Sequence, residues 1–316
     1  MCTVLVTGGA GFIGSSIVDL LLSNGYRVVI VDNLSNSNKD KVNKNSIFYN
    51  EDITDLKLCK IFEIERPKYV IHAAAQISVE KSIQDPIYDA NTNIVGSLNL
   101  LECCRRSGVK KIIYSSTAAV YGDPLYLGID EKHELNPISF YGLSKYITER
   151  YIKLFYDLYG LKYTILRYSN VYGARQNFKG EGGVIPCFIK HMLKGERPTI
   201  YGSGDQTRDF IYVDDVASAN IIALESGDND TFNIGTGIEV SINDLLKFLS
   251  IIIGKCSPLY MPEKNGDITF CYFDISKSAK VLDWEPKSEL KDGLEKTIKW
   301  YSKLITSNAA SSIEEN

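Results

Sequence analysis

The chain of 316 residues contains no cluster of basic residues and no long apolar segment. Lys and Arg number 35 and Asp and Glu 39, so the formal net charge is -4 and a surface for nucleic acid or anionic lipid is not expected. No stretch approaches the ~18 consecutive apolar residues of a membrane-spanning helix. The first residues also lack the basic and apolar regions of a signal peptide. We therefore expect no membrane partner, no nucleic-acid partner and a cytoplasmic location.

Cysteine and histidine are sparse and scattered. The seven cysteines are odd in number and include no C-x-x-C pair, which argues against a disulfide framework or a thiolate zinc site and fits a reducing compartment. The three histidines, at positions 72, 133 and 191, lack the spacing of ligands on one helix, so we expect no metal site.

The composition that remains is typical of a folded protein, with 44% hydrophobic and 23% charged residues. The first half alternates short, β-branched apolar runs with helical patterns. The predicted strands are Val4–Val6, Val28–Val31, Tyr69–Ile71, Lys111–Tyr114 and Tyr163–Arg167. The predicted helices are Phe12–Leu22, Asp55–Glu65, Ile87–Cys104 and Tyr141–Tyr159. This alternation predicts an α/β fold with a parallel sheet that is covered on both faces.

Glycine and proline become frequent after about residue 168, which indicates a second, smaller lobe. Its predicted elements are the strands Phe210–Val213, Phe232–Ile234 and Phe270–Phe273 and the helix Ile242–Ile252. We predict a first domain at 1–168 that elements near 208–235 complete, a second lobe at 169–305, and a polar tail at 306–316 that frays.

A glycine-rich turn follows the first predicted strand. Gly8, Gly11 and Gly14 lie between strand and helix, where glycine lets the backbone approach a pyrophosphate and the helix N-terminus supplies amide donors. Asp32 ends the next predicted strand, 18 residues after Gly14, and its carboxylate can accept hydrogen bonds from an adenosine ribose. A purely structural glycine turn is the alternative. The order of strand, glycines, helix and acid favours a Rossmann-type NAD site over one for the phosphorylated cofactor.

Tyr141 and Lys145 lie four residues apart and therefore share one face of a predicted helix. A neighbouring ammonium stabilises a phenolate, which makes a tyrosine able to transfer protons beside a hydride acceptor. The spacing alone is common, and an ordinary surface pair is the alternative. The hydroxyl-rich strand end Ser115-Ser116-Thr117 could supply a third partner.

Together these segments resemble the extended short-chain dehydrogenase/reductases, and most of all the UDP-glucose (UDP-galactose) 4-epimerase family. The similarity spans Val4 to about Trp300. It is carried by the segments Thr7–Gly14, Asp32–Asn36, Asp52-Ile53, His72–Gln76, Ser115–Gly122, Tyr141–Lys145, Arg167–Gly173 and Arg208–Phe210. The resemblance implies a Rossmann-type doubly wound parallel sheet with a smaller α/β substrate-binding lobe, and NAD as cofactor.

The resemblance also implies roles for individual residues. The catalytic set would be Thr117, Tyr141 and Lys145. The cofactor residues would be Gly8, Gly11, Phe12, Ile13, Gly14, Asp32, Asn33, Ser35, Asn36, Asp52, Ile53, Ala73, Ala75, Gln76, Asn93, Ser115, Tyr141, Lys145 and Tyr168. The residues for a UDP-sugar substrate would be Gln76, Thr117, Tyr141, Asn170, Val184, Arg208, Lys264, Asp267 and Cys271.

Several of these proposed substrate residues could have structural roles instead. Arg208 could pair with neighbouring aspartates instead of a diphosphate, and Asn170 could serve a turn. Family members usually carry arginine before the last Gly-Asp motif, whereas this chain has Lys264-Asn265-Gly266-Asp267. Lysine supplies charge without a bidentate fork, so one phosphate contact is in doubt.

The resemblance excludes some reactions. Related dehydratases and decarboxylases place an acid two residues after the catalytic hydroxyl, where this chain has Ala119. Alanine cannot move a proton, so the sequence predicts reversible oxidation at one carbon: 4-epimerisation of UDP-hexoses through a 4-keto intermediate. The alternatives are a UDP-uronate 4-epimerase, another NAD-dependent sugar-nucleotide oxidoreductase, or a catalytically silent NAD-binding regulatory protein.

Two finer expectations concern the sugar and the assembly. In the resembling epimerases the position of Cys271 borders the 2-substituent of the sugar, and a small residue there tends to admit N-acetylhexosamines. A buried cysteine that merely packs is the alternative. The resemblance further implies a homodimer through the helices near Ile87–Cys104 and Tyr141–Tyr159, where Tyr146, Ile147, Ile152 and Leu154 could serve either the core or the partner.

Overall fold

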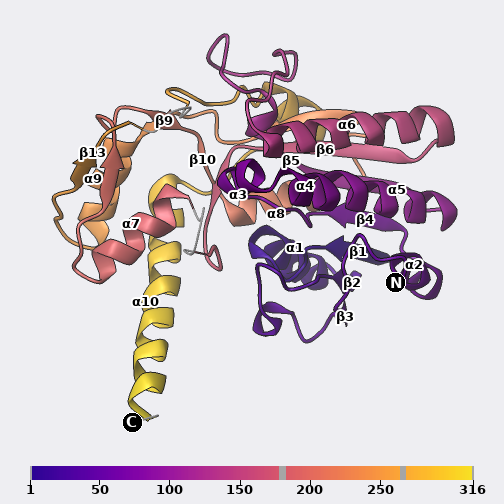
Figure 1. The fold of residues 1–316 in the computed structure, drawn as a ribbon, viewed down its shortest axis with the longest axis horizontal. Helices are drawn as coiled ribbons and strands as arrows, with labels where there is room; N and C mark the ends of the chain where they lie inside the picture. The colour runs from indigo at the N-terminus through magenta and orange to yellow at the C-terminus, as the bar shows by residue number, and fades with distance from the viewer. Residues whose placement is uncertain (1, 178–182, 264–267, 315–316) are drawn as a thin grey trace.

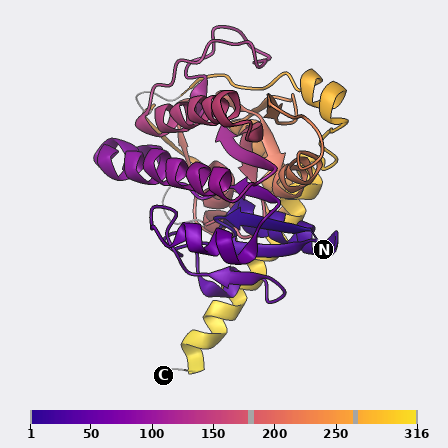
Figure 2. The same cartoon turned by 90° about the vertical axis from the view of Figure 1, so that its right-hand side faces the viewer.

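The computed structural model describes residues 2–177, 183–263 and 268–314, and for 307–314 the backbone alone. Figure 1 shows two parts side by side. A sheet with flanking helices lies at the right, and a smaller lobe lies at the left. In both views the yellow end of the last helix extends away from the rest of the chain (Figure 1 and Figure 2).

The central sheet has seven strands, and every neighbouring pair is parallel. In spatial order the strands are β11 (Asp230–Ile234), β6 (Lys162–Tyr168), β5 (Lys111–Thr117), β4 (Tyr69–His72), β1 (Thr3–Thr7), β2 (Arg27–Val31) and β3 (Ile47–Tyr49). The order reverses direction at β1, which is the topology of a doubly wound Rossmann fold. The predicted fold class is confirmed.

Helices cover both faces of this sheet, as its continuous apolar strands require. One face packs against α1 (Phe12–Ser23) and α8 (Val213–Ile222). The other packs against α2 (Leu58–Glu65), α5 (Gly96–Arg106) and α6 (Phe140–Tyr159). Short helices at the carboxyl edge complete this part: α3 (Val79–Gln84), α4 (Pro86–Ala90), the π-helical η2 (Asn91–Val95) and the 3-10 turn η3 (Ala118–Val120), with η1 (Lys39–Lys41) following β2.

The smaller lobe has its own apolar core, built mainly from three helices. These are α7 (Val184–Leu193), α9 (Ile242–Ile252) and α10 (Leu290–Glu314). Its strands form three pairs: β7 (Asn170–Tyr172) with β10 (Phe210–Tyr212), β9 (Thr207–Arg208) with β12 (Val240–Ser241), and β8 (Thr199–Tyr201) with β13 (Leu259–Met261). The π-helical η4 (Ser278–Leu282) returns toward β11.

Four sequence expectations differ from the structure. The helix predicted over Ile87–Cys104 is α4, η2 and α5 in succession, and the helix predicted from Asp55 begins at Leu58. The strand predicted at Phe270–Phe273 is wrong, because only an isolated bridge from Phe273 to Ile129 forms there. The segment expected to fray is helical to Glu314 as the end of α10.

Cys59 and Cys103 form a disulfide between α2 and α5. The sequence argued against disulfides from the odd cysteine count and the missing C-x-x-C pair. Those signals could not detect this pair, because 44 residues separate the two cysteines and only the packing of the two helices brings them together.

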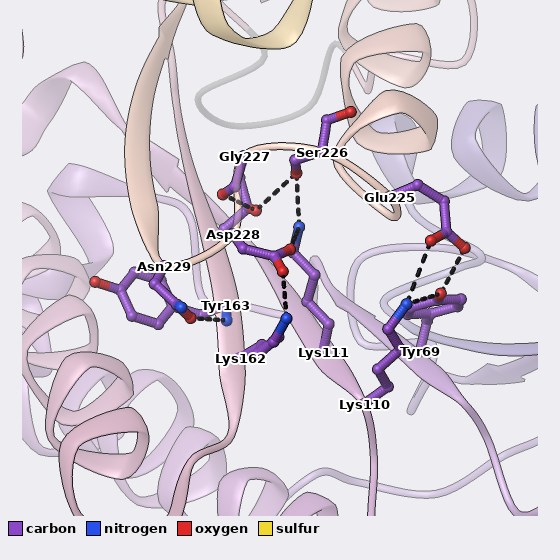
Figure 3. Close-up of polar contacts among 11 residues, drawn as sticks. Tyr69, Lys110, Lys111, Lys162, Tyr163, Glu225, Ser226, Gly227, Asp228 and Asn229 are labelled. Carbon is purple, nitrogen blue, oxygen red and sulfur yellow. Dashed lines mark hydrogen bonds and ion pairs between the residues drawn. The ribbon is translucent and has the colours of Figure 1, made fainter.

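A cluster of polar and charged side chains lies at the amino edge of the sheet (Figure 3). The candidate site described below lies at the opposite, carboxyl edge. Lys111 at the start of β5 is buried, and its Nζ lies 2.8 Å from Asp228 Oδ1 and 2.6 Å from the carbonyl oxygen of Ser226. Lys162 pairs with the same carboxylate at 2.7 Å. Asp228 belongs to the turn before β11, so this cluster fastens the seventh strand to its neighbours.

Candidate active site

The glycine turn presses against the end of β4. Gly8 has a φ of +71°, and a Cβ there would lie 2.6 Å from Ala74 N. A Cβ on Gly14 would collide with the carbonyl oxygen of Gly8. Helix α1 begins directly after this turn with neither a side-chain cap nor an acidic residue in its first turn. Its amide groups and positive dipole end are therefore available to an anionic group.

Asp32 at the end of β2 is held beside this turn. Its Oδ2 accepts a hydrogen bond of 3.0 Å from Ala10 N, and its Oδ1 accepts one of 2.8 Å from Leu34 N. Asn33 Nδ2 donates to Asp52 Oδ2 at 2.6 Å. These hydrogen bonds fix the carboxylates of Asp32 and Asp52. Each carboxylate can still accept further hydrogen bonds from the hydroxyl groups of a ribose.

A pocket opens above the glycine turn, and most of the predicted cofactor residues line it. Those in its wall are Gly8, Gly11, Phe12, Ile13, Gly14, Asp32, Asn33, Ser35, Asn36, Asp52, Ile53, Ala73 and Ala75. The sequence reasoning missed several others in the same wall, among them Ser37, Lys41, Glu51, Ile77, Tyr88, Thr92 and Arg175.

Lys41 and Arg175 are the cations in this wall. Lys41 Nζ donates to the carbonyl oxygen of Arg175 at 3.2 Å, and the Arg175 guanidinium pairs with Asp19 at 2.5 Å. Burial lowers the pKa of Lys41, Arg175 lowers it further, and Asp32 opposes both. No sequence signal could identify this pair, because 134 residues separate the two and only the fold joins them.

Tyr141 and Lys145 lie in the first turns of α6, one helical turn apart. Ser139 caps this helix by accepting a hydrogen bond from Gly142 N. Thr117 ends β5 and caps η3, accepting a hydrogen bond of 3.2 Å from Ala119 N. Because α6 packs on η3, the structure brings the three predicted catalytic residues to one corner of the carboxyl edge.

The Lys145 ammonium is buried without an ion-pair partner in contact. The side chain is 3% exposed, and its Nζ lies 4.4 Å from the centroid of the Tyr114 ring. Burial lowers the pKa of Lys145 to about 7, whereas the Glu149 and Asp89 carboxylates raise it. Among the described residues no side chain or carbonyl accepts a hydrogen bond from Nζ. A buried cation with free donors fits a site that receives ligand hydroxyls, such as those of a nicotinamide ribose.

Gln76 and Asn93 form a buried network beside this corner. Asn93 Oδ1 accepts from Gln76 N at 2.8 Å, and Asn93 Nδ2 donates to Gln76 O at 2.9 Å. Gln76 Nε2 donates to Asp89 Oδ1 at 2.8 Å, and Ser144 Oγ on α6 accepts from Asn93 at 3.1 Å. Asn93 lies in the π-helical η2, a distortion that often marks functional sites. This network ties α4 and η2 to α6, the helix that carries Tyr141 and Lys145.

Ser115 and Tyr168 pair with each other on the opposite face of the sheet. Their hydroxyl oxygens lie 3.0 Å apart, and Asn220 on α8 bonds to the same Tyr168 oxygen. Burial raises the pKa of Tyr168 to about 12, so the phenol is neutral. Neither residue belongs to the pocket wall described above.

Two of the predicted substrate residues, Asn170 and Arg208, lie on short strands that Asp209 connects. Asn170 begins β7 and donates from its backbone to Asp209 O at 2.9 Å, while Arg208 precedes Asp209 on β9. Cys271 is buried in a cluster with Val120 and Tyr121, and this burial raises the pKa of its thiol to about 11. Val184 begins α7. Lys264 and Asp267 lie outside the described residues.

The comparisons with known proteins agree with this geometry. A family model described as "NAD dependent epimerase/dehydratase family" matches residues 4–235. A putative UDP-glucose 4-epimerase of Methanocaldococcus jannaschii is 49% identical over 94% of this chain and 97% of its own.

Two solved structures are similar along nearly the whole chain. The UDP-glucose 4-epimerase of Thermotoga maritima with UDP-glucose is 48% identical with a TM-score of 0.94, covering 96% of this chain and 99% of the other. The UDP-N-acetylglucosamine 4-epimerase of Methanobrevibacter ruminantium with UDP-N-acetylmuramic acid is 38% identical with a TM-score of 0.92 over the same shares of the two chains.

The chain therefore belongs to the NAD-dependent epimerase/dehydratase family. Within this family, the similar proteins reported above are sugar-nucleotide 4-epimerases. Within the described residues, none of the helices combines the length and apolar character that crossing a membrane requires.

Proposed function

We propose that this protein catalyses NAD-dependent 4-epimerisation of UDP-hexoses. One observation carries the proposal: a buried lysine lies one helical turn from a tyrosine at the carboxyl edge of the sheet, and the pocket over the glycine turn at the same edge has Asp32 in its wall. The lysine and the pocket suit one extended dinucleotide, with its nicotinamide ribose at Lys145 and its adenosine ribose at Asp32.

The cofactor supplies reversible hydride transfer when it is bound, and the residues of this chain move the proton. Tyr141 as phenolate takes the proton of the sugar 4-hydroxyl while that carbon becomes a ketone. Lys145 stabilises the phenolate by its charge, and Thr117 orients the oxygen. After the 4-keto sugar presents its other face, Tyr141 returns the proton, so the product differs only in configuration at C4.

The two parts of the chain divide the binding work in this proposal. Residues 1–168, with elements of 208–235, hold NAD, and residues 169–305 hold the UDP-sugar. Arg208 supplies a planar fork for the diphosphate, and Asn170, Val184 and Asp267 are the further proposed ligands of the UDP-sugar. Support comes from β11 and α8, which lie in the range 208–235 and pack into the first part.

We further propose that the pocket accepts the N-acetylated sugars as well as UDP-glucose and UDP-galactose. The similar protein from Methanobrevibacter ruminantium is a UDP-N-acetylglucosamine 4-epimerase, and the cysteine at position 271 is a small side chain that would leave room for a 2-substituent. A panel of UDP-glucose, UDP-galactose and their N-acetylated forms, each assayed for the 4-epimer, tests both the reaction and its range. No turnover on any member by the NAD-loaded protein would favour a regulatory NAD-binding protein instead.

Assembly as a homodimer in the cytoplasm completes the proposal. Apolar side chains on the outer helices are exposed, with Ile87 at 73% on α4 and Leu158 at 62% on α6. Leu154 is also exposed, whereas Ile152 is buried in the core and is not available to a partner. Light scattering after size exclusion tests the dimer, with a monomer at micromolar concentration as the contrary result.

A further inference from the structure

A buried ion pair lies behind the catalytic residues. Arg167 Nε donates to Glu149 Oε1 at 3.0 Å and its Nη2 donates to Oε2 at 2.6 Å, so the contact is bidentate. The side chains are 2% and 0% exposed. Replacing such a buried pair by apolar residues of similar size is often neutral or stabilising in proteins, so stability alone is a weak reason for its presence.

The pair joins the two elements that carry the proposed catalytic residues, α6 and β5, to the neighbouring strand β6. Glu149 lies on α6, one turn beyond Lys145 and two beyond Tyr141. Arg167 lies on β6, where it is the register partner of Ser116 on β5. Ser116 precedes Thr117, and its hydroxyl donates to Glu149 Oε1 at 2.6 Å. One carboxylate therefore holds the catalytic helix to the strand that ends in Thr117.

The network continues past η3 to the edge of the sheet. Arg167 Nη1 donates to the Tyr121 hydroxyl at 2.9 Å, and that hydroxyl donates to Asn233 Oδ1 at 2.7 Å. Tyr121 directly follows η3, the turn against which α6 begins. Both ends of the segment Ser116–Tyr121, which contains Thr117, are thus bonded to the same pair.

We propose that Glu149 and Arg167 are positioning residues for the epimerase reaction: their pair fixes the catalytic helix against the segment that carries Thr117. This inference rests on the proposed function. A displacement of about 1 Å between reacting groups can lower a rate about a hundredfold, so the register of α6 against β5 matters more to turnover than to folding.

The pair also contributes to the field at Lys145. The charged and titratable groups that face this ammonium are Glu149 on α6, Asp89 on α4, His72 on β4 and Tyr114 on β5, besides Tyr141 itself. Glu149 and Asp89 favour the charged lysine, and His72 is held neutral by burial. Loss of Glu149 should therefore also shift the pH dependence of turnover.

The test is a double substitution, Glu149→Leu with Arg167→Met, which leaves no unpaired buried charge. We expect the NAD-loaded double variant to melt within a few degrees of the parent and to bind UDP with unchanged affinity by calorimetry. Its kcat for UDP-glucose should fall at least about tenfold with little change in KM, and its pH profile should move. The single variant Glu149→Gln, which keeps an acceptor for Ser116, should retain more activity than Glu149→Ala.

The control is the ion pair at the other end of β5, Lys111→Met with Asp228→Asn, in which the lysine is buried and the aspartate is exposed (Figure 3). It removes an ion pair of the same strand far from the site and should leave kcat and the pH profile unchanged. An unchanged kcat in the Glu149–Arg167 double variant would overturn the proposal. An equal loss of kcat in the control variant would also overturn it, because the effect would then reflect lowered stability and not the positioning of the catalytic residues. Absence of turnover in the parent would instead refute the proposed function.

Discussion

Gly142 lies directly against the backbone of Ala119: a Cβ on residue 142 would come within 2.5 Å of the Ala119 carbonyl oxygen. Gly142 follows Tyr141, and Ala119 is the second residue after Thr117. The glycine thus lets the start of the catalytic helix approach the turn that holds the threonine. Because Gly142 has no side chain, two segments that are more than twenty residues apart in the sequence can come into contact there.

Gly142→Ala should therefore impair turnover more than stability. The added methyl group must displace α6 or η3, at a cost of about 1–3 kcal/mol for overpacking. The resulting shift between Tyr141 and Thr117 should lower kcat about a hundredfold. Steady-state kinetics and thermal melts measure the two effects. Arg150→Ala, at an exposed position on the same helix, is the control and should change neither. A kcat near that of the parent would refute the contact.

Tyr141→Phe should remove most epimerase activity while folding and NAD content stay intact. The phenol oxygen is the proposed proton carrier, and phenylalanine keeps the ring but not the acid. Absorbance at 260 and 340 nm reports the bound cofactor, and the UDP-sugar panel reports turnover. Epimerisation at the rate of the parent would mean that another group carries the proton.

Asp32 should make the protein select NAD over its 2′-phosphorylated form. The carboxylate is fixed by Ala10 and Leu34 and would face the added phosphate, a like-charge contact worth at least about tenfold in affinity. Asp32→Ala should weaken the binding of NAD and reduce the preference for NAD over NADP, because Lys41 would remain as a cation in the pocket wall. Calorimetry on the cofactor-free protein measures both affinities. Tighter binding of NADP to the parent would contradict the assignment.

Local signals were sufficient for the dinucleotide half of the fold. The β-branched runs, the glycine turn and Asp32 each lie within one short segment, so sequence pattern alone predicted β1, α1 and β2, whereas most of the other residues of the pocket wall were predicted from the family resemblance. Strand β3 was missed because its three residues are only half-buried and carry little alternation.

Contacts between distant segments were beyond the reach of the sequence. The Arg175 and Lys41 contact, the Cys59–Cys103 disulfide and the Glu149–Arg167 pair all depend on how separate elements pack. The predicted strand at Phe270–Phe273 failed for the same reason. Its apolar residues meet the loop at Ile129 through one bridge instead of a neighbouring strand.

His72 should make the protein lose stability as the pH falls below about 6.5. Its Nδ1 lies 2.8 Å from Thr7 Oγ1, and its Nε2 lies 2.8 Å from Ser97 Oγ. Ser97 donates its own proton to Asn93 O, so Nε2 must be the protonated nitrogen and Nδ1 the acceptor. Burial, together with a smaller effect of the Lys145 charge, lowers the pKa of His72 to about 3.

The direction of this pH effect follows from the number of protons that the folded and unfolded chains bind. Between about pH 6.5 and 3 the unfolded chain binds a proton at this residue and the folded chain does not, so the free energy of unfolding falls by up to about 1.4 kcal/mol per pH unit. Urea unfolding from pH 7 to 4 measures the slope. His72→Gln, which keeps an uncharged hydrogen-bonding side chain, should show a shallower slope. Equal slopes for parent and variant would refute the assignment.

Cys271→Tyr should depress activity on the N-acetylated sugars far more than on UDP-glucose and UDP-galactose. The strand predicted at Phe270–Phe273 does not form, but Phe273 N donates to Asp209 Oδ2 at 3.3 Å, which holds this segment against the residue that follows Arg208. Cys271 is buried in a small cluster with Val120 and Tyr121, directly beyond Thr117, so its side chain lies close to the proposed sugar site.

A tyrosine there would occupy the volume that an acetamido group needs, at a cost of about 1–3 kcal/mol for the acetylated substrates alone. Ratios of kcat/KM between acetylated and plain substrates measure the effect and cancel any loss of active protein. Cys271→Ala is the control, because it enlarges the space and should keep both activities. The competing reading is that Cys271 only packs the cluster. An equal loss on both substrate pairs, with a lowered melting temperature, would establish that reading, since overfilling a core does not distinguish one substrate from another.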